Sequence, residues 1–414
     1  MHPPVALEPL LTYLEQAEDR VITIQQSLTA TRALGPENGG DGEWTKAEYI
    51  ESVLSALGVD AITHVDAPDS RVSRKTRPNL VVKIPGSTPQ TLWLFGHMDV
   101  VGAGDEKAWH SNPWLVARDG DWLYGRGVED NQQAIVSMLL LVEALKKTGT
   151  KPTHSLGLVF MADEENGSKY GLGHILDSSP SFFAPHDKYV VPDFGSPDGT
   201  KIEIAEKAQL WLRISTKGTQ CHASMPHLGK NAFVAGAELV STLHAELPGL
   251  FPQTNPIFSP PCCTFVPTRH DANTEAVNIL PGNDVFYLDC RILPDVAPET
   301  VLERIRGLAM SVASRHQVKM DVDVVQLQTA SSVSMDTPAL SALRKAIQAV
   351  YGHEATNIGV GGGTVAALLR QKGLPALVWS CLENSCHQPN ERSSITATCK
   401  DAQVFAHLLM SSDA

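Results

Sequence analysis

Histidines and carboxylates recur in five short segments of the chain, at positions where they could act together. The first segment is Gly96-His97-Met98-Asp99. Residues i and i+2 of a strand face the same way, so Asp99 could orient or polarise His97 as a metal ligand. The alternative for this segment alone is an ordinary hydrogen-bonded histidine at a strand end.

Two further segments supply carboxylates. Gly125-Arg126-Gly127-Val128-Glu129-Asp130 has two glycines that permit a tight turn before a helix, where Asp130 would equally suit an N-cap. Asp163-Glu164-Glu165 places three mutually repelling carboxylates after an apolar run. A cation would relieve that repulsion, and one carboxylate held apart could act as a general base. A solvated acidic loop is the alternative.

The last two segments carry little meaning in isolation: Val191-Pro192-Asp193 holds one carboxylate, and His387 lies in a loop. Together, the five segments supply two imidazoles and three carboxylates, namely His97, Asp130, Glu165, Asp193 and His387. This mixed set suits two zinc ions, each with one histidine and one terminal carboxylate, bridged by a shared aspartate. Such a pair binds and deprotonates a water and polarises a carbonyl, and Glu164 is left to take the proton.

The elements around these segments indicate an α/β domain. Residues 91–95 and 155–162 are continuous apolar runs, typical of strands buried on both faces of a parallel sheet, and a helix is predicted between them at 131–147. Sites in open α/β sheets form beyond the carboxyl ends of the strands, where His97 and residues 163–165 fall. Two earlier helices are predicted at 7–29 and at 45–57, the latter with Thr45 as N-cap.

The pattern changes near residue 203. An alternating strand at 207–217 is followed by a helix, two strands, a helix and a strand, which is the split βαβ order. We therefore expect residues 203–328 to form a domain inserted into a discontinuous α/β domain of residues 1–202 and 329–414. The α/β pattern resumes with a helix at 338–351, a glycine-rich loop at 359–363, a helix at 364–372 and a strand at 375–380.

Length and composition narrow the possible partners and location of the protein. The 414 residues exceed what one core usually supports, and 33 basic against 46 acidic side chains give a net charge of −13, which argues against a nucleic-acid partner. Residues 1–20 lack the features of a signal peptide, and no apolar run is long enough to cross a bilayer, so we expect no membrane association. Seven scattered cysteines without a C-x-x-C pair favour reduced thiols in the cytoplasm.

These segments, in this order, resemble the signature of the M20 metallopeptidases, which include dipeptidases, carboxypeptidase G, aminoacylases and desuccinylases. The matching motifs are G-H-x-D at 96–99, G-R-G-x-x-D at 125–130, D-E-E at 163–165, H-x-P-N-E at 387–391, and 277–282 and 289–294 in the inserted domain. The resemblance implies a zinc-exopeptidase-like mixed sheet with helices on both faces, plus an α+β lid and dimerisation domain. It implies two zinc ions, or cobalt or manganese in their place.

The resemblance also implies individual roles. His97 and Asp193 would hold one metal and Glu165 and His387 the other, with Asp130 bridging, Glu164 as general base and Asp99 behind His97. His222 would reach the neighbouring active site of a homodimer and stabilise the oxyanion. Arg291 would pair with a substrate carboxylate, beside a pocket lining of Asn278, Gly362, Gly363 and Thr364.

Two departures from the family pattern affect the expected substrate. Asn131-Gln132-Gln133 stands where Lys-Gly-Gly is usual, and Val365-Ala366 where Ser-Asp or Ser-Asn is frequent. Neither removes a ligand. Aspartate at position 193 is the family tendency in dipeptidases, so we expect a small peptide-like substrate, with an N-acyl-amino-acid deacylase as the alternative.

Other classes of protein agree less well with the sequence. A nucleotide-binding oxidoreductase would need G-x-G-x-x-G, but residues 359–364 have Thr364 in place of the third glycine. A binding module with an inert metal site would not need Glu164. Cys221, Ser224 and Cys386 lack an evident orienting group for nucleophilic catalysis.

Overall fold

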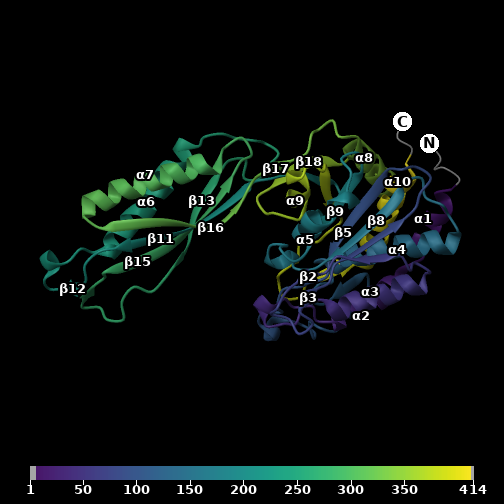
Figure 1. The fold of residues 1–414 in the computed structure, drawn as a ribbon, viewed down its shortest axis with the longest axis horizontal. Helices are drawn as coiled ribbons and strands as arrows, with labels where there is room; N and C mark the ends of the chain where they lie inside the picture. The colour runs from purple at the N-terminus through teal and green to yellow at the C-terminus, as the bar shows by residue number, and fades with distance from the viewer. Residues whose placement is uncertain (1–5, 412–414) are drawn as a thin grey trace. The chain divides into compact units, whose positions relative to one another are not determined.

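The computed structural model describes residues 6–411 and divides the chain into two compact units. The first unit runs to Ile204 and resumes at Val333–Asn357 and from Thr364 onward, and the second comprises Ala205–Ser332 and Ile358–Gly363. Each unit is built on its own sheet (Figure 1). None of the described helices is both long enough and apolar enough to span a bilayer.

The first unit contains a mixed sheet in the order β1-β4-β8-β5-β9-β19-β10. Its centre is parallel: β5 (Thr91–His97) lies between β8 (Ser155–Met161) and β9 (Lys188–Gly195), and β9 pairs with β19 (Ala376–Ser380). Every residue of β5 and β8 is buried, as their continuous apolar runs predict. The outer strands β4 (Leu80–Ile84), β1 (Ile62–His64) and β10 (Lys201–Glu206) are antiparallel to their neighbours.

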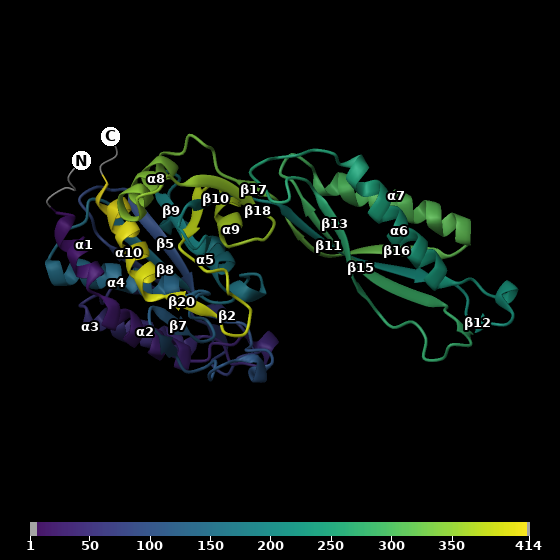
Figure 2. The ribbon, with the colours of Figure 1, turned by 180° about the vertical axis from the view of Figure 1, so that it is seen from behind.

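Helices cover both faces of this sheet. On one side α4 (Gln132–Thr148), whose side chains are all buried from Gln132 to Leu145, packs against β5 and against α10 (Ile395–Met410) (Figure 2). The helices α1 (Glu8–Glu15), α2 (Glu18–Ala30) and α8 (Pro338–Tyr351) complete this layer, and α3 (Trp44–Ala56) packs against α2 and α4. On the other side α5 (Leu172–Ser178) and α9 (Ala366–Gln371) share a core with Trp93 and Phe95. The prediction of a mixed α/β sheet with helices on both faces is confirmed.

Some predicted elements differ in the structure. The single helix expected at residues 7–29 is two helices, because the chain turns at Gln16 and Ala17. Thr45 is not an N-cap, since α3 begins at Trp44 with Glu43 before it. The strand β9 contains Pro192, a residue that usually argues against a central strand, and the sequence did not predict it.

The second unit folds about an antiparallel sheet in the order β13-β15-β11-β16. Chain order is β11 (Ala208–Lys217), α6 (Ala232–Leu250), β13 (Thr264–His270), β15 (Asn283–Ile292), α7 (Pro298–His316) and β16 (Lys319–Gln328). The two helices pack against one another and against the sheet, as in a split βαβ unit. A short ladder joins β12 (Cys221–His222) to β14 (Ile279–Leu280).

A small sheet outside the main one matters for the site. It has the order β20-β7-β6, from β20 (Arg392–Ser394), β7 (Trp122–Tyr124) and β6 (Ala117–Asp119). Arg392 pairs with Tyr124, so the loop that follows β7 and the loop that precedes β20 start at the same place. Shorter strands are β2 (Ala67–Pro68) and β3 (Thr76–Arg77), which pair together, and β17 (Ser331–Ser332) and β18 (Thr356–Val360), which pair with β10.

Candidate metal centre

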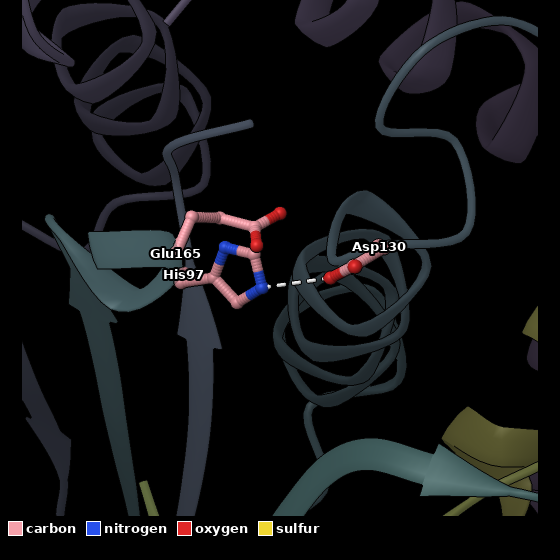
Figure 3. Close-up of side chains that lie close together, drawn as sticks. All are labelled: His97, Asp130 and Glu165. Carbon is pink, nitrogen blue, oxygen red and sulfur yellow. Dashed lines mark hydrogen bonds and ion pairs between the residues drawn. The ribbon is translucent and has the colours of Figure 1, made fainter. Parts of the chain in front are cut away.

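Five segments of the first unit bring histidines and carboxylates together. Three of them lie at or just beyond the carboxyl ends of β5, β8 and β9, and two are the loops that carry Asp130 and His387. Two groups of three residues have ligand atoms that all lie within 4.8 Å of one another. One group is His97, Asp130 and Glu165, which point toward one another in Figure 3, and the other is His97, Glu164 and Asp193. His387 joins the first group, with its Nε2 3.0 Å from Glu165 Oε2.

His97 is the buried centre of both groups. It is the last residue of β5, and its side chain is 1% exposed. Its Nδ1 lies 3.0 Å from the Asp99 carbonyl oxygen, which can only accept, so Nδ1 carries a proton. Nε2 therefore faces the carboxylates, at 2.9 Å from Asp130 Oδ1 and 3.6 Å from Asp193 Oδ1. A histidine oriented in this way presents one defined nitrogen to a metal.

The carboxylate of Asp99 contacts both His97 and the backbone of the acidic pair Glu164 and Glu165. It is 3.5 Å from His97 Nδ1, and its two oxygens accept the backbone N–H groups of Glu164 and Glu165, both at 3.0 Å. Asp99 therefore holds the short helix η3 (Glu164–Asn166) that presents the acidic pair. The third carboxylate of that segment, Asp163, turns away and accepts the Tyr170 backbone N–H at 2.9 Å.

Asp130 faces two histidines at once. Its Oδ1 lies 2.9 Å from His97 Nε2, and its Oδ2 lies 3.1 Å from His387 Nε2. The capping role that the sequence left open for Asp130 does not apply, because the N-cap of α4 is Asn131. A carboxylate with one oxygen toward each histidine is suited to bridge two cations.

Asp193 is positioned by an irregularity in β9. Val191 pairs with Val378 and Gly195 with Ser380, so four residues of β9 oppose two of β19. Such a bulge re-aims a side chain. The Asn131 amide then fixes Asp193: its Nδ2 donates to Asp193 Oδ1 at 2.7 Å, and its Oδ1 accepts the His97 backbone N–H at 3.3 Å.

The electrostatics of the cluster require positive charge. Burial and the nearby Asp130 raise the pKa of Glu165 to about 7, and burial with Asp193 raises the pKa of Glu164 well above its ordinary value. Hydrogen bonds to Asp130 and Glu165 raise the pKa of His387 to about 10. Burial alone would lower the pKa of His97, but its carboxylate partners raise it well above normal. The histidines thus supply the charge that crowded carboxylates need in the metal-free chain.

These residues fit a bound metal. The donors are imidazole nitrogens and carboxylate oxygens, the set that zinc accepts, and they are already oriented by buried hydrogen bonds. A cation would replace the protons of His97 and His387 as the counter-charge. A small cavity of about 40 Å³ adjoins the cluster and is lined in part by Asp130, Asp193 and Cys386.

The remaining residues that the sequence singled out lie in or beside the second unit. His222 is exposed in β12, and its Nδ1 lies 2.7 Å from Ser224 Oγ. Arg291 is already paired: its Nε and Nη2 donate to Asp289 at 2.7 and 3.0 Å, and its Nη1 donates to the Gly361 carbonyl at 2.7 Å.

The residues that the resemblance implies for the pocket lining differ in their local surroundings. Asn278 is exposed, and its carbonyl accepts the Ala223 N–H. Gly362 has open space where a side chain would start, whereas a Cβ at Gly363 would lie 2.7 Å from Gln209. Thr364 begins the last segment of the first unit, and its Oγ1 accepts the Ala366 N–H at 3.1 Å.

The sequence does not predict the residues that connect the candidate ligands. By sequence, Asn131 is a departure from a motif, although its position beside Asp130 indicates a contact with the cluster. Glu129 and Glu391 are almost fully buried carboxylates next to ligand-bearing positions. Glu391 ends the H-x-P-N-E motif without a role of its own, which is a signal for that residue, whereas Glu129 falls on an unspecified position of G-R-G-x-x-D and has no such signal.

Comparison with known proteins shows which family this chain resembles. The model of peptidase family M20/M25/M40 matches residues 93–411. An uncharacterized metallohydrolase of Methanococcus maripaludis is 35% identical over 411 residues, which cover 94% of this chain and 99% of the relative. A succinyl-diaminopimelate desuccinylase of Gluconacetobacter diazotrophicus is 27% identical over 398 residues, covering 96% of this chain and 98% of the relative.

Solved structures share the fold at low sequence identity. Human carnosine dipeptidase 1 superposes with a TM-score of 0.80 at 16% identity, covering 99% of both chains. An M20 metallo-carboxypeptidase of Sulfolobus solfataricus gives 0.72 at 18% identity, covering 98% of this chain and 99% of the other. At these identities the likeness establishes the fold.

Proposed function

Because the chain belongs to the M20/M25/M40 family of metallopeptidases, we propose that it is a two-zinc hydrolase that cleaves the amide bond of a dipeptide or a similar small amino-acid conjugate. The observation that carries this proposal is Asp130, whose two oxygens face two different histidines. His97 and Asp193 would hold one ion, and Glu165 and His387 the other, with Asp130 shared. When bound, the two ions activate a water and polarise the scissile carbonyl.

Glu164 is the residue that we assign to proton transfer. The backbone of its turn is held by Asp99, and its carboxylate belongs to the group with His97 and Asp193. With the other three carboxylates and the two histidines assigned as ligands, the oxygen of Glu164 would accept the proton of the attacking water and pass it to the leaving amine nitrogen. Burial and the negative charge of Asp193 raise the pKa of Glu164 in the metal-free chain, and bound cations would lower it again and leave the carboxylate able to accept a proton.

Residues of the second unit would complete the site. We assign oxyanion stabilisation to His222, the substrate carboxylate to Arg291, and the pocket lining to Asn278, Gly362, Gly363 and Thr364. Asp289 already neutralises much of the Arg291 charge, so this residue would contribute directed N–H groups more than net charge. We further propose a homodimer through the second unit, with His222 acting in the partner's site.

The proposed location is the cytoplasm. All seven cysteines are free thiols, which suits a reducing compartment.

We propose no nucleic-acid partner, because the net charge of −13 opposes binding to nucleic acid.

The second candidate is an N-acyl-amino-acid deacylase. It is favoured by the desuccinylase relative at 27% identity, whereas the aspartate at position 193 favours the dipeptidase. The two reactions differ in whether the substrate needs a free α-amino group.

A substrate screen separates the two candidates. Zinc-loaded protein would be offered dipeptides, including β-linked and isoaspartyl ones, beside N-acetyl and N-succinyl amino acids. Hydrolysis of free dipeptides that is lost when the same α-amino group is acylated would support the dipeptidase. The opposite preference would support the deacylase, and hydrolysis of neither class would contradict both.

A further inference from the structure

Two loops carry Asp130 and His387, and each contains a buried carboxylate that binds the other loop. Glu391, which is fully buried, accepts the backbone N–H groups of Gly127 at 3.0 Å, Glu129 at 2.9 Å and Asp130 at 3.0 Å. Its charge is balanced by Arg126, whose Nη1 donates at 2.6 Å. The loop that ends at Asp130 is therefore wrapped around a side chain from the loop of His387.

Glu129 makes the converse contact. It is 2% exposed, and its oxygens accept the backbone N–H groups of Asn384 at 2.9 Å and Ser385 at 2.6 Å. The Ser385 hydroxyl adds a third bond at 2.6 Å. The neighbour of Asp130 in the chain thus holds the backbone two residues before His387.

Apart from its ion pairs with Asp130 and Glu165, His387 depends on this contact for its position. Its side chain is 53% exposed, so packing does not hold it. Its φ is +61°, and those of Asn384 and Asn390 are +60° and +63°. Three residues other than glycine in the left-handed region persist only when their surroundings determine the backbone.

We propose that Glu129 and Glu391 form a reciprocal clasp, and that both are positioning residues that hold Asp130 and His387 at the spacing that one metal ion needs. The inference rests on the proposed function, and it assigns roles to two carboxylates that touch neither metal nor substrate. Glutamine cannot replace either residue, because its NH₂ group would face N–H donors in place of an acceptor oxygen.

The test compares the whole chain with Glu129→Gln and Glu391→Gln, first without metal and then during titration with zinc. In the metal-free protein, amide exchange should rise about tenfold or more at residues 384–387 in Glu129→Gln and at 127–130 in Glu391→Gln, because the bonded N–H groups lose their acceptor. The half-saturating zinc concentration for activity should rise about 10–100-fold, and kcat should recover at saturating zinc. Recovery with zinc separates positioning from a general loss of structure.

Glu143→Gln is the matched control. Glu143 is a buried carboxylate of α4 that binds Tyr13 and Arg20, so its loss should lower stability and change neither readout. If a glutamine variant does not fold, Ser385→Ala removes one bond to Glu129 and should raise the half-saturating zinc concentration a few-fold, at least about threefold.

The outcomes distinguish this inference from the function on which it rests. A wild-type chain that binds two zinc ions, with variants whose zinc affinity and amide exchange match the wild type, would overturn the clasp alone. A wild-type chain that binds no zinc would overturn the proposed function, and the metal-related role of the clasp with it.

Discussion

Asn131 shows how one uncharged residue can determine the ligand geometry. Its Nδ2 donates to Asp193 Oδ1 and to the Pro192 carbonyl, at 2.7 and 2.9 Å, and its Oδ1 accepts the His97 N–H. Asn131 therefore orients the same oxygen of Asp193 that faces His97 Nε2 at 3.6 Å. The residue that departs from the family motif by sequence thus lies against two of the proposed ligands.

We predict that Asn131→Ala weakens the binding of one of the two zinc ions by about 10–100-fold, because Asp193 loses the donor that orients it. Zinc titration of the metal-free variant should then resolve one tight and one weak site. Gln132→Ala is the control, since Gln132 binds Thr29 and no ligand. Equal loss at both sites, or none, would argue against this role.

Glu164→Ala tests proton transfer separately from metal binding. We expect kcat to fall by about 10²–10⁴-fold while zinc content stays near that of the wild type, because a general base contributes to the rate and not to the ligand set. Metal analysis of the same sample that is assayed provides the measurement. If zinc and activity disappear together, Glu164 is a ligand, as its place beside His97 and Asp193 would allow.

At the scale of elements, α10 is joined to the sheet by one buried carboxylate. Asp401 accepts from Ser380 Oγ at 2.5 Å, Gln133 Nε2 at 3.0 Å and Tyr351 Oη at 3.0 Å. Burial raises the pKa of Asp401 from 3.8 to about 6, although these hydrogen bonds lower it. Between these two pH values, the folded chain keeps a proton that the unfolded chain has lost, so stability from this group falls as pH rises.

We predict that Asp401→Asn is most destabilising near pH 4 and that its deficit against the wild type shrinks toward pH 7. Between these pH values, the difference in free energy of unfolding between wild type and variant should shrink by about two pKa units, or roughly 3 kcal/mol. The reason is that only the wild type must ionise a buried carboxyl group. Thermal unfolding of both chains at several pH values measures it. A deficit that is constant across this range would show that Asp401 does not titrate as described.

Local patterns were enough to place most of these elements and to single out His97 and Glu165, whereas Asp193 and His387 were proposed as ligands only together with the other segments. His97, Glu164 and Glu165 follow apolar runs, and the ends of parallel strands converge by the logic of the fold. The helix α10 was not predicted because it is buried around most of its circumference, so its apolar period is weak. The clasp was beyond sequence reasoning, since Glu129 and Asn384 are 255 residues apart.

The whole molecule consists of two units, and the second interrupts the first. At the scale of the whole molecule, the proposal to test is that two chains share an active site through His222. His222 is exposed, and within the second unit its ring is engaged only by neighbours such as Ser224 among the described contacts. An exposed imidazole of this kind would be free to act in a partner's site.

We predict that His222→Ala and Glu164→Ala, each nearly inactive, recover about a quarter of wild-type activity when mixed equally, because random exchange within a two-fold dimer leaves half the chains in mixed dimers with one complete site each. Activity should rise with the time allowed for exchange. A mixture no more active than its components, from chains that light scattering shows to be dimeric, would place His222 in its own chain's site.

The proposed two-zinc site depends on Asp130 as the shared ligand. Zinc titration of the metal-free wild type and of Asp130→Ala tests this role most directly. We predict two tightly bound zinc ions per wild-type chain and fewer than about one in Asp130→Ala, because both ions lose the bridging carboxylate. A wild-type chain that binds no zinc, or an Asp130→Ala chain that binds as much as the wild type with equal affinity, would contradict it.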